Sequence, residues 1–600
     1  MRRFRPTLLA GAVALALSAG TASAQFTNTY VFGDSLSDAG QYGSRFTTNP
    51  GLVTPMYIGQ NFGIAVTPSF QGGNDFAQGG ARVNSPSASI PPGVPDNSIA
   101  QQVNQFLPKV PFNPNALYQI QGGANDVLQL AQQFLGGQIT QTQMQAAVSQ
   151  AAVDLATQVG KLKAAGANYV ILQNLPDIGK SPLATGQGPQ AVQLFSGLST
   201  LFNTTLNAAV ASAGLQVVQF NTSALLGEII ASPALYGFVN ATSPVCTVQS
   251  ALNCTPSTLV PNGNPLTWVF ADVIHPTTGA DLLQTQAIMS MITGPMQMAA
   301  LGEAPMDVER ANWRALDGRM MSAINAPGSP GKIQAWAAYD YADADIFGNS
   351  LSGNGNINTI SVGADYRVSD KMLAGIQFAY SDYDGSFGNG GGDFKLREPM
   401  ITFYGGYGEG PWYVGATLGA GSLDFSSNRT IALGPTTRTE SGDTTGYHVV
   451  GRLLGGYWFK YSNIDHGPFL KLTYEKIVVR QFSENGSDST ALTFGQQNND
   501  SFWSSLGWQA TGNVGGFRPF ARATWEYNFQ ADTRQVSAKA NTLNGWYTMP
   551  GFQQDDNWWL FDVGVSRDFG NVTGFISGNA SASKGDGDYW AVTVGIRVPL

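Results

Sequence analysis

The spacing of apolar residues changes once along the chain and divides it into two halves. In the first half, up to about residue 294, short apolar runs alternate with stretches of helical periodicity. The clearest helical stretch is 143–165, where Met144, Val148 and Leu155 recur at helical spacing. The runs that suggest strands are 29–32, 63–66, 116–121, 169–173 and 215–220. Alternating strands and helices predict an α/β domain whose parallel sheet is covered on both faces.

From Lys332 onward the period is two, and one side of each segment is apolar while the other is small or polar. This alternation is typical of strands that face lipid on one side and water or a plug on the other. Twelve such segments are centred near residues 337, 362, 376, 402, 418, 453, 474, 506, 524, 563, 578 and 593. We therefore predict a 12-stranded transmembrane β-barrel, with a soluble β-sandwich as the alternative.

The connections between these segments support the barrel. Short ones at 368–371, 408–411, 461–467, 513–516 and 568–571 alternate with longer ones rich in Gly, Asn, Asp and Ser, such as 426–445, 483–499 and 531–556. Outer-membrane barrels have short turns on one side and long loops on the other. An even strand count leaves the first and last residues of the barrel chain on the periplasmic side.

A helix is predicted between the halves, over residues 299–325, and the Gly-Ser-Pro-Gly cluster from Gly328 ends it. Its charged stripe is too continuous for a core helix and suits the wet lumen of a barrel, although a solvated linker is the alternative. The stripe comprises Asp307, Glu309, Arg310, Arg314, Asp317 and Arg319. The predicted units are thus 25–298, a connector at 299–331, and the barrel at 332–600.

Residues 1–24 have the pattern of a secretory signal peptide. Arginines precede an apolar run at 8–17, and Ala22-Ser23-Ala24 form a small-residue cleavage site, so Gln25 begins the predicted mature chain. The apolar run is short for a membrane anchor, and no later segment reaches the ~18 unbroken apolar residues of a transmembrane helix.

Composition narrows the function classes. The 600 residues carry a net charge of -9 and only 12% charged side chains, so no basic surface for nucleic acid is expected. The only cysteines, Cys246 and Cys254, lie in a Pro/Ser/Thr-rich stretch of an exported chain. We predict a local disulfide closing a surface loop, with two free thiols as the alternative. Two thiols alone cannot form a structural zinc site.

Candidate chemistry gathers in the first half. The run Tyr30–Phe32 reads as the end of a buried strand, and Gly33-Asp34-Ser35 breaks it, which places Ser35 at the carboxyl edge of the sheet, where α/β sheets bind ligands. His275 is the only histidine of this half among three in the chain. Asp272 precedes it by a single turn and could orient its ring.

Four motifs in this order resemble the GDSL (SGNH) family of serine esterases and lipases. They are the stretch 30–38 around Gly-Asp-Ser-Leu, the glycine block 74–82, Gly123-Ala124-Asn125-Asp126, and Asp272-Val273-Ile274-His275. The resemblance implies a three-layer α/β fold and ester hydrolysis through an acyl-enzyme, without a metal or other cofactor. No Gly-x-Ser-x-Gly elbow surrounds Ser35, so the α/β-hydrolase arrangement does not apply.

The resemblance also implies residue roles. Ser35 would be the nucleophile, His275 the general base, and Asp272 the group that orients the histidine. The oxyanion hole would combine the Ser35 N–H, the Gly80 N–H and the Asn125 side-chain amide. Gly80 is preferred to its neighbour Gly79 because the family's glycine usually precedes the small residue.

Over nearly its whole length the chain resembles the autotransporter GDSL esterases, in which the barrel anchors the enzyme and the helix lies in the lumen. Leu600 in place of a terminal phenylalanine is a mild departure. The resemblance implies a monomeric outer-membrane protein with its catalytic domain at the cell surface. The expected partners are carboxylic esters such as fatty-acyl esters, membrane lipid and the barrel-assembly machinery. The competing functions are an adhesin on the same scaffold and a pore.

Overall fold

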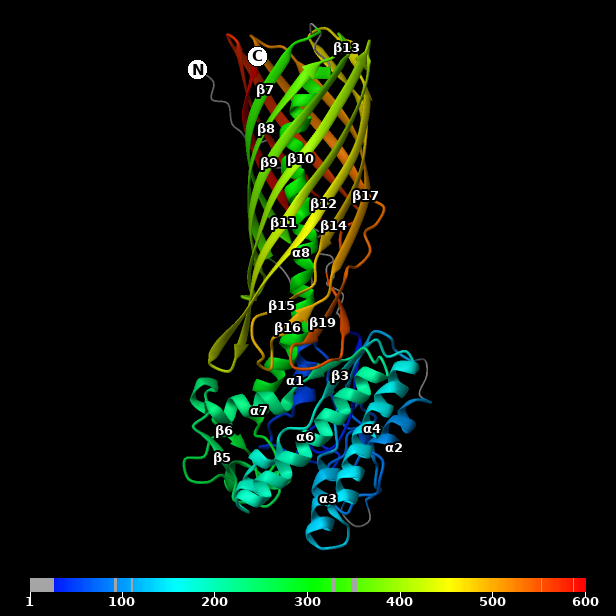
Figure 1. The fold of residues 1–600 in the computed structure, drawn as a ribbon, viewed down its shortest axis with the longest axis vertical. Coiled ribbons are helices and arrows are strands. Elements are labelled where there is room, and N and C mark those ends of the chain that lie inside the picture. The colour runs from blue at the N-terminus through cyan, green and yellow to red at the C-terminus, as the bar shows by residue number, and fades with distance from the viewer. Residues whose placement is uncertain are drawn as a thin grey trace, which may run out of the picture.

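The computed structural model describes residues 26–90, 94–108, 112–324, 330–346, 353–551, 553–585 and 587–600. The predicted signal peptide lies outside them. Figure 1 shows the amino-terminal domain at one end of a long β-barrel, joined to it by a helix that runs up the lumen. Among the described residues, no helix combines the length and apolar character needed to cross a membrane.

The amino-terminal domain is built on a parallel sheet in the order β1-β2-β3-β4. Its strands are β1 (Asn28–Phe32), β2 (Ala116–Ile120), β3 (Tyr169–Gln173) and β4 (Val218–Phe220). All four fall on predicted runs. A smaller parallel pair, β5 (Asn240–Pro244) and β6 (Trp268–Phe270), lies beside the main sheet.

The predicted strand at 63–66 is wrong. These residues follow helix α1 (Thr54–Asn61), and the Gly63 and Ile64 amides bond back to carbonyls of that helix. The place beside β1 is taken instead by the segment 74–78, whose Phe76 amide donates to Val31 O at 2.8 Å. An apolar run alone could not distinguish a strand from the exit of a helix.

Alternate residues of the strands enter two separate cores, which makes three layers (Figure 1). Leu117 and Ile171 pack with α1, α7 (Thr222–Ala231) and the start of α8 (Thr278–Ile324). Tyr118 and Val170 pack on the other face with α2 (Ile99–Phe106), α3 (Ala124–Leu135), α4 (Gln141–Ala164) and α6 (Pro189–Ser212). The remaining short helices are η1 (Ser69–Gln71), η2 (Ile178–Lys180), α5 (Pro182–Thr185), η3 (Pro233–Tyr236), η4 (Ala251–Asn253) and η5 (Pro256–Thr258). The predicted three-layer α/β fold is confirmed.

Within the described ranges, twelve antiparallel strands close into a barrel through the β12–β14 pairing. Each contains one of the predicted segment centres, so the 12-stranded barrel is confirmed. The strands are β7 (Ile333–Ile346), β8 (Gly353–Arg367), β9 (Met372–Phe387), β10 (Gly392–Glu409), β11 (Trp412–Leu433), β12 (Thr436–Tyr457), β14 (Ile464–Val479), β17 (Gln497–Gly512), β18 (Phe517–Asn528), β21 (Asn557–Phe569), β22 (Val572–Ala582) and β23 (Tyr589–Pro599), with β13 (Phe459–Tyr461) continuing β12.

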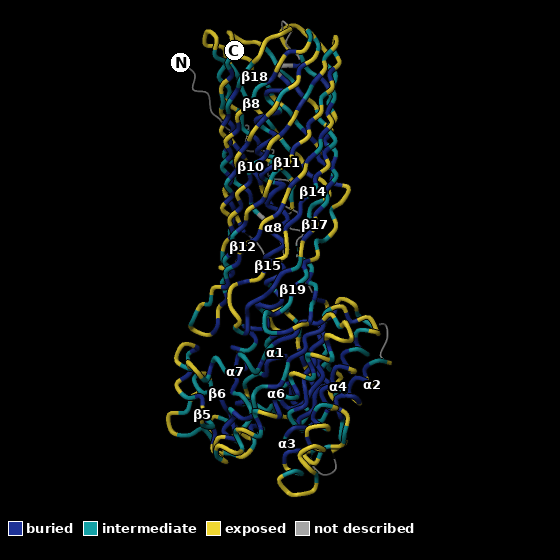
Figure 2. Tube along the Cα trace, viewed as in Figure 1, coloured by how far each residue is buried: buried dark blue, intermediate teal, exposed yellow. Residues whose placement is uncertain are grey.

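The outer wall of the barrel is apolar. Ile360, Leu418 and Leu453 are each about 60% exposed, and exposed positions recur along the whole wall in Figure 2. An outward apolar band of this kind is what contact with lipid requires.

Helix α8 begins at Thr278 and not at 299, and it continues without a break past the predicted limit between residues 298 and 299. Its first half extends the apolar core of the amino-terminal domain into the barrel. The charged stripe then pairs with the lumen wall: Arg319 contacts Asp365 (2.6 Å) and Glu309 contacts Arg452 (3.0 Å). Arg314 likewise pairs with Asp340, and Asp317 with Arg522.

The sequence predicted long loops at 426–445, 483–499 and 531–556. In the structure these three connections contain regular β-strands. Residues 426–445 continue β11 and β12 as a paired hairpin, and the other two connections supply a four-stranded sheet. This sheet, named the saddle sheet here, comprises β15 (Phe482–Ser483), β16 (Leu492–Phe494), β19 (Gln535–Ala540) and β20 (Tyr547–Pro550). Both lie at the end of the barrel that faces the amino-terminal domain (Figure 1), where tertiary contacts replace water.

Candidate active site

Ser35 lies in the turn that follows β1 and is nearly buried, with 8% of its surface exposed. The turn is held by Asp34, whose Oδ1 accepts from the Gln121 side chain (2.6 Å) and the Leu36 amide (3.1 Å). Burial raises the pKa of Asp34, while these hydrogen bonds oppose the rise. Gln121 directly follows β2, so two neighbouring strands position the turn.

His275 joins Ser35 to Asp272. Its Nε2 lies 2.9 Å from Ser35 Oγ, and its Nδ1 lies 2.8 Å from Asp272 Oδ2. The ring also packs against Phe46, with 5.0 Å between the ring centres. The three side chains come from the turn after β1 and the loop after β6, and they form the chain of contacts that a serine nucleophile, its base and an orienting carboxylate require.

Asp272 is 2% exposed and is held at several points. The amides of Ile274 and His275 donate to its Oδ1 at 2.9 and 2.8 Å. Burial raises the pKa of Asp272, but the attraction of His275 and these hydrogen bonds outweigh it, so the pKa ends below its ordinary value. The carboxyl therefore stays ionised at neutral pH and can hold the Nδ1 proton of the histidine.

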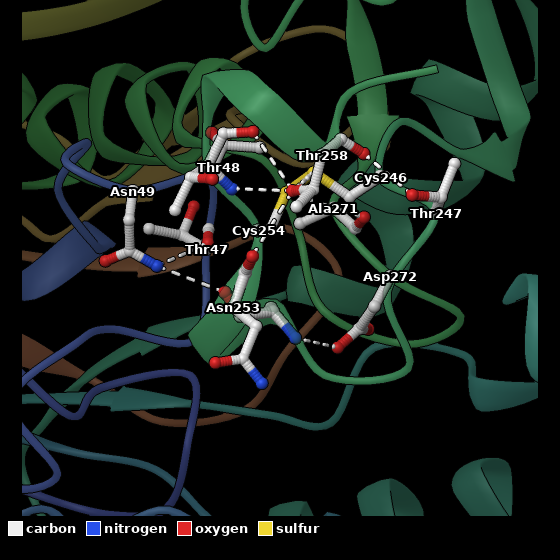
Figure 3. Close-up of a disulfide and its surroundings, with 12 residues drawn as sticks. Thr47, Thr48, Asn49, Cys246, Thr247, Asn253, Cys254, Thr258, Ala271 and Asp272 are labelled. Atoms are coloured by element: carbon white, nitrogen blue, oxygen red, sulfur yellow. Dashed lines mark hydrogen bonds between the residues drawn. A yellow bond between two sulfur atoms is a disulfide. The ribbon is translucent and has the colours of Figure 1, made fainter.

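The structure contains the disulfide Cys246–Cys254. Figure 3 shows the disulfide and Asp272 in one view. The loop is more than a surface feature, because both cysteines are buried and the Ala251 amide within it donates to Asp272 Oδ2 at 2.7 Å. The carbonyl of Cys254 also accepts from the Asn49 amide at 2.8 Å. Sequence reasoning missed this support, because a backbone donor has no signature in residue type.

The candidate oxyanion donors differ in their availability. The Gly79 amide donates to Asp38 Oδ2 at 2.8 Å and is therefore occupied. For the amides of Ser35 and Gly80, no acceptor is found in the described part of the chain. The Asn125 side-chain amide donates one hydrogen to Ala81 O (3.0 Å). This contact fixes the amide and leaves its second hydrogen available for a ligand. This arrangement favours Gly80 over Gly79 as donor.

An ion pair joins the two blocks that carry these donors. Arg82 Nε lies 2.9 Å from Asp126 Oδ1, and the Val83 amide donates to Asp126 Oδ2 at the same distance. Burial raises the pKa of Asp126, while Arg82 opposes this effect. No group of three or more His, Cys, Asp or Glu side chains within the described ranges is arranged to hold a metal ion.

Comparisons with known proteins agree with both halves. Residues 30–288 match the model of the GDSL-like lipase/acylhydrolase family, and residues 335–580 match the autotransporter β-domain. A Pseudomonas putida protein described as an uncharacterized protein in the trpE-trpG intergenic region is 31% identical, covering 88% of this chain and 94% of its own. Esterase EstA of Pseudomonas aeruginosa is 29% identical and covers 91% of both chains. Lipase 1 of Photorhabdus luminescens is 25% identical and covers 96% of both.

Among solved structures, the translocator domain of NalP from Neisseria meningitidis is 14% identical, with a TM-score of 0.41 over 50% of this chain and 98% of that one. The assignment rests on the family models and the long relatives, not on this weaker likeness. The chain belongs to the family of outer-membrane autotransporters that carry a GDSL-like lipase/acylhydrolase domain, a family of esterases and lipases.

Proposed function

We propose that the protein hydrolyses carboxylic esters through an acyl-enzyme on Ser35, and that its barrel displays this activity at the cell surface. The observation that carries the proposal is the pair of contacts at His275, 2.9 Å to Ser35 Oγ and 2.8 Å to Asp272 Oδ2. An imidazole held between a hydroxyl and an ionised carboxylate can take the hydroxyl proton as the oxygen attacks.

The reaction follows from this geometry. Ser35 Oγ attacks the ester carbonyl carbon while His275 Nε2 takes the hydroxyl proton, and the carbonyl electrons move to the oxygen. As the tetrahedral species collapses, the bond to the alcohol breaks, and His275 returns the proton to the leaving alkoxide. Water then attacks the acyl carbonyl carbon while His275 Nε2 takes one of its protons. The bond to Ser35 Oγ breaks, His275 returns the proton to Ser35, and the carboxylic acid is released. The amides of Ser35 and Gly80 and the side chain of Asn125 are the proposed oxyanion donors.

Three features of the barrel support display of the esterase domain at the cell surface. Its outward face is apolar, the lumen is occupied by α8, and the amino-terminal domain lies at the end opposite the short turns (Figures 1 and 2). The lumen helix favours anchoring over conduction as the role of the barrel. The proposed partners are membrane lipid and the barrel-assembly machinery, with the protein acting as a monomer.

The decisive test is Ser35→Ala in the full-length protein, assayed on whole cells with a chromogenic butyrate ester. We expect turnover to fall by at least ~10³-fold while the variant reaches the surface in normal amount, because only a hydroxyl is removed. Surface display is measured with antibody or added protease. Ser37→Ala is the matched control, since Ser37 is a buried serine of the same turn and makes no hydrogen bond to His275 in the described structure. Substantial activity in Ser35→Ala would remove Ser35 as the nucleophile. An amino-terminal domain that stays hidden from protease on intact wild-type cells would contradict display.

A further inference from the structure

A cavity of about 70 Å³ adjoins the active site. Leu36, Ile274 and Pro276, which are sequence neighbours of Ser35 and His275, form one side of it. Leu225, Leu226 and Ile229 of α7 also line the cavity and form its α7 wall. The cavity lies beyond the carboxyl ends of β3 and β4, where α/β sheets bind ligands, and its lining is mostly apolar. An acyl chain is the part of an ester that such a lining suits.

The α7 wall is tied to the barrel half of the molecule. Leu225 and Ile229 face the cavity, and the neighbouring side of the same helix carries Glu228. The Glu228 carboxylate accepts from Arg438 Nη2 at 2.7 Å, from the Ser489 amide at 2.7 Å and from the Ser489 hydroxyl at 3.0 Å. All three donors belong to the β-hairpin and saddle-sheet region, and the esterase domain adds only a longer contact from the Tyr236 hydroxyl (3.5 Å).

Arg438 is itself fixed. It lies on the extension of β12, is only 15% exposed, and also donates to the hydroxyls of Tyr236 (2.7 Å) and Thr490 (2.8 Å). The guanidinium therefore connects α7, the η3 turn and the saddle sheet at one point. Its planar fork of donors suits such a multiple contact better than a lysine would.

The hairpin that carries Arg438 is held in place by contacts at its tip and near the barrel. The Gly434 amide at its tip donates to the Gln286 side chain of α8 at 2.7 Å. Gly434 has a φ of +63°, and a Cβ there would approach Tyr236 O to 2.8 Å, so glycine permits this close contact. Further back, the fully buried pair Arg429–Glu484 (2.7 Å) joins the hairpin to the saddle sheet. The barrel thus presents a rigid surface to α7.

We propose that the cavity beside Ser35 binds the acyl chain of the ester, and that Arg438, through Glu228, fixes the position of the α7 wall of this cavity. Arg438 is then a positioning residue contributed by the barrel domain, not a catalytic one. The inference rests on the proposed esterase function and deepens it. The acyl-chain preference of the enzyme is accordingly a joint property of both halves.

The test measures kcat and KM of the full-length protein for chromogenic acetate, butyrate and octanoate esters. Both variants disrupt the Arg438–Glu228 contact, Arg438→Ala from the barrel half and Glu228→Gln from the esterase half. Each should change the octanoate-to-acetate ratio of kcat/KM by about fivefold or more, mainly through KM, because a loosened wall affects the long acyl chain and not the reacting atoms. The acetate kcat should stay within about twofold. The double variant should change the ratio by less than the two single changes combined, because both single variants disrupt the shared Arg438–Glu228 contact.

Lys395→Ala is the matched control, since it removes an exposed ion pair to Asp384 on the barrel strands. Its ratio should equal that of the wild type. Unchanged ratios in both Arg438→Ala and Glu228→Gln would overturn the inference while leaving the esterase intact. Should Arg438→Ala fail to assemble, Glu228→Gln, which leaves the barrel sequence unchanged, decides the question. A wild-type protein inactive on every ester would instead refute the proposed function.

Discussion

The esterase domain and the barrel place their polar residues in opposite ways. In the esterase, apolar side chains fill two cores, and buried carboxylates such as Asp38 and Asp272 lie in the loops of the site, where backbone amides hold them. In the barrel, apolar side chains cover the outer wall, and charged side chains in the lumen pair with α8. Buried charge therefore serves chemistry in one half and assembly in the other. Variants that remove one charge from each half test this distinction.

The largest effect is expected for Asp272→Asn. The Asn oxygen can still accept from the Ile274 and His275 amides, but its NH₂ group favours the wrong tautomer of His275, so turnover should fall by about 10³- to 10⁴-fold. The free energy of unfolding should fall by only about 1 kcal/mol, because one hydrogen bond, from the Ala251 amide, is lost. Kinetics on a butyrate ester and thermal unfolding of the purified protein measure the two quantities. A variant that retains most of its turnover would show that another carboxylate orients the histidine, and the esterase charges would then lose their assigned role.

The next effect is expected for Arg319→Ala in the lumen. It leaves the buried Asp365 carboxylate without its ion-pair partner, which should lower the stability of the barrel by about 3 kcal/mol. The esterase rate should be unchanged at temperatures where the protein is folded. Urea unfolding in detergent, followed by strand circular dichroism, gives the stability. Lys371→Ala is the control, because its partner Glu409 is exposed and no measurable change is expected. Equal stabilities of the two variants would contradict an assembly role for the lumen charges.

The last effect concerns pH. Asp281, at the first turn of α8, accepts hydrogen bonds from Thr47 (3.0 Å) and Thr54 (3.0 Å), and burial raises its pKa to about 8. The folded protein thus keeps a proton that the unfolded chain gives up. The stability linked to this group is greatest below the ordinary carboxyl pKa and falls as the pH rises towards 8. Asp281→Asn should flatten this fall in melting temperature between pH 4 and 8. An identical slope in the variant would mean that Asp281 is ionised in the folded state.

Sequence reasoning succeeded where a local pattern determines the structure. A period of two located all twelve strands, since each must present an apolar face to lipid, and the motifs around Ser35 and His275 located the side chains that meet at 2.9 Å. It failed where the partner is distant. Residues 426–445 have the composition of a solvated loop, yet they form a hairpin because the esterase domain and α8 contact its tip. The contacts of Ala251 with Asp272 and of Arg438 with Glu228 likewise exist only in the folded chain.

The start of α8 has a consequence for where the reaction products go. The helix begins at Thr278, three residues after His275, and its first turns are part of the esterase core. A protease that cut the chain between the two halves would have to cut into this core, so cleavage would damage the enzyme that it released. With 47 residues the helix is about 70 Å long, and it runs unbroken from the esterase core into the barrel, so the two halves share one continuous element. The proposed esterase would therefore act as a permanent part of the cell that makes it, and its acid and alcohol products would form where that cell is.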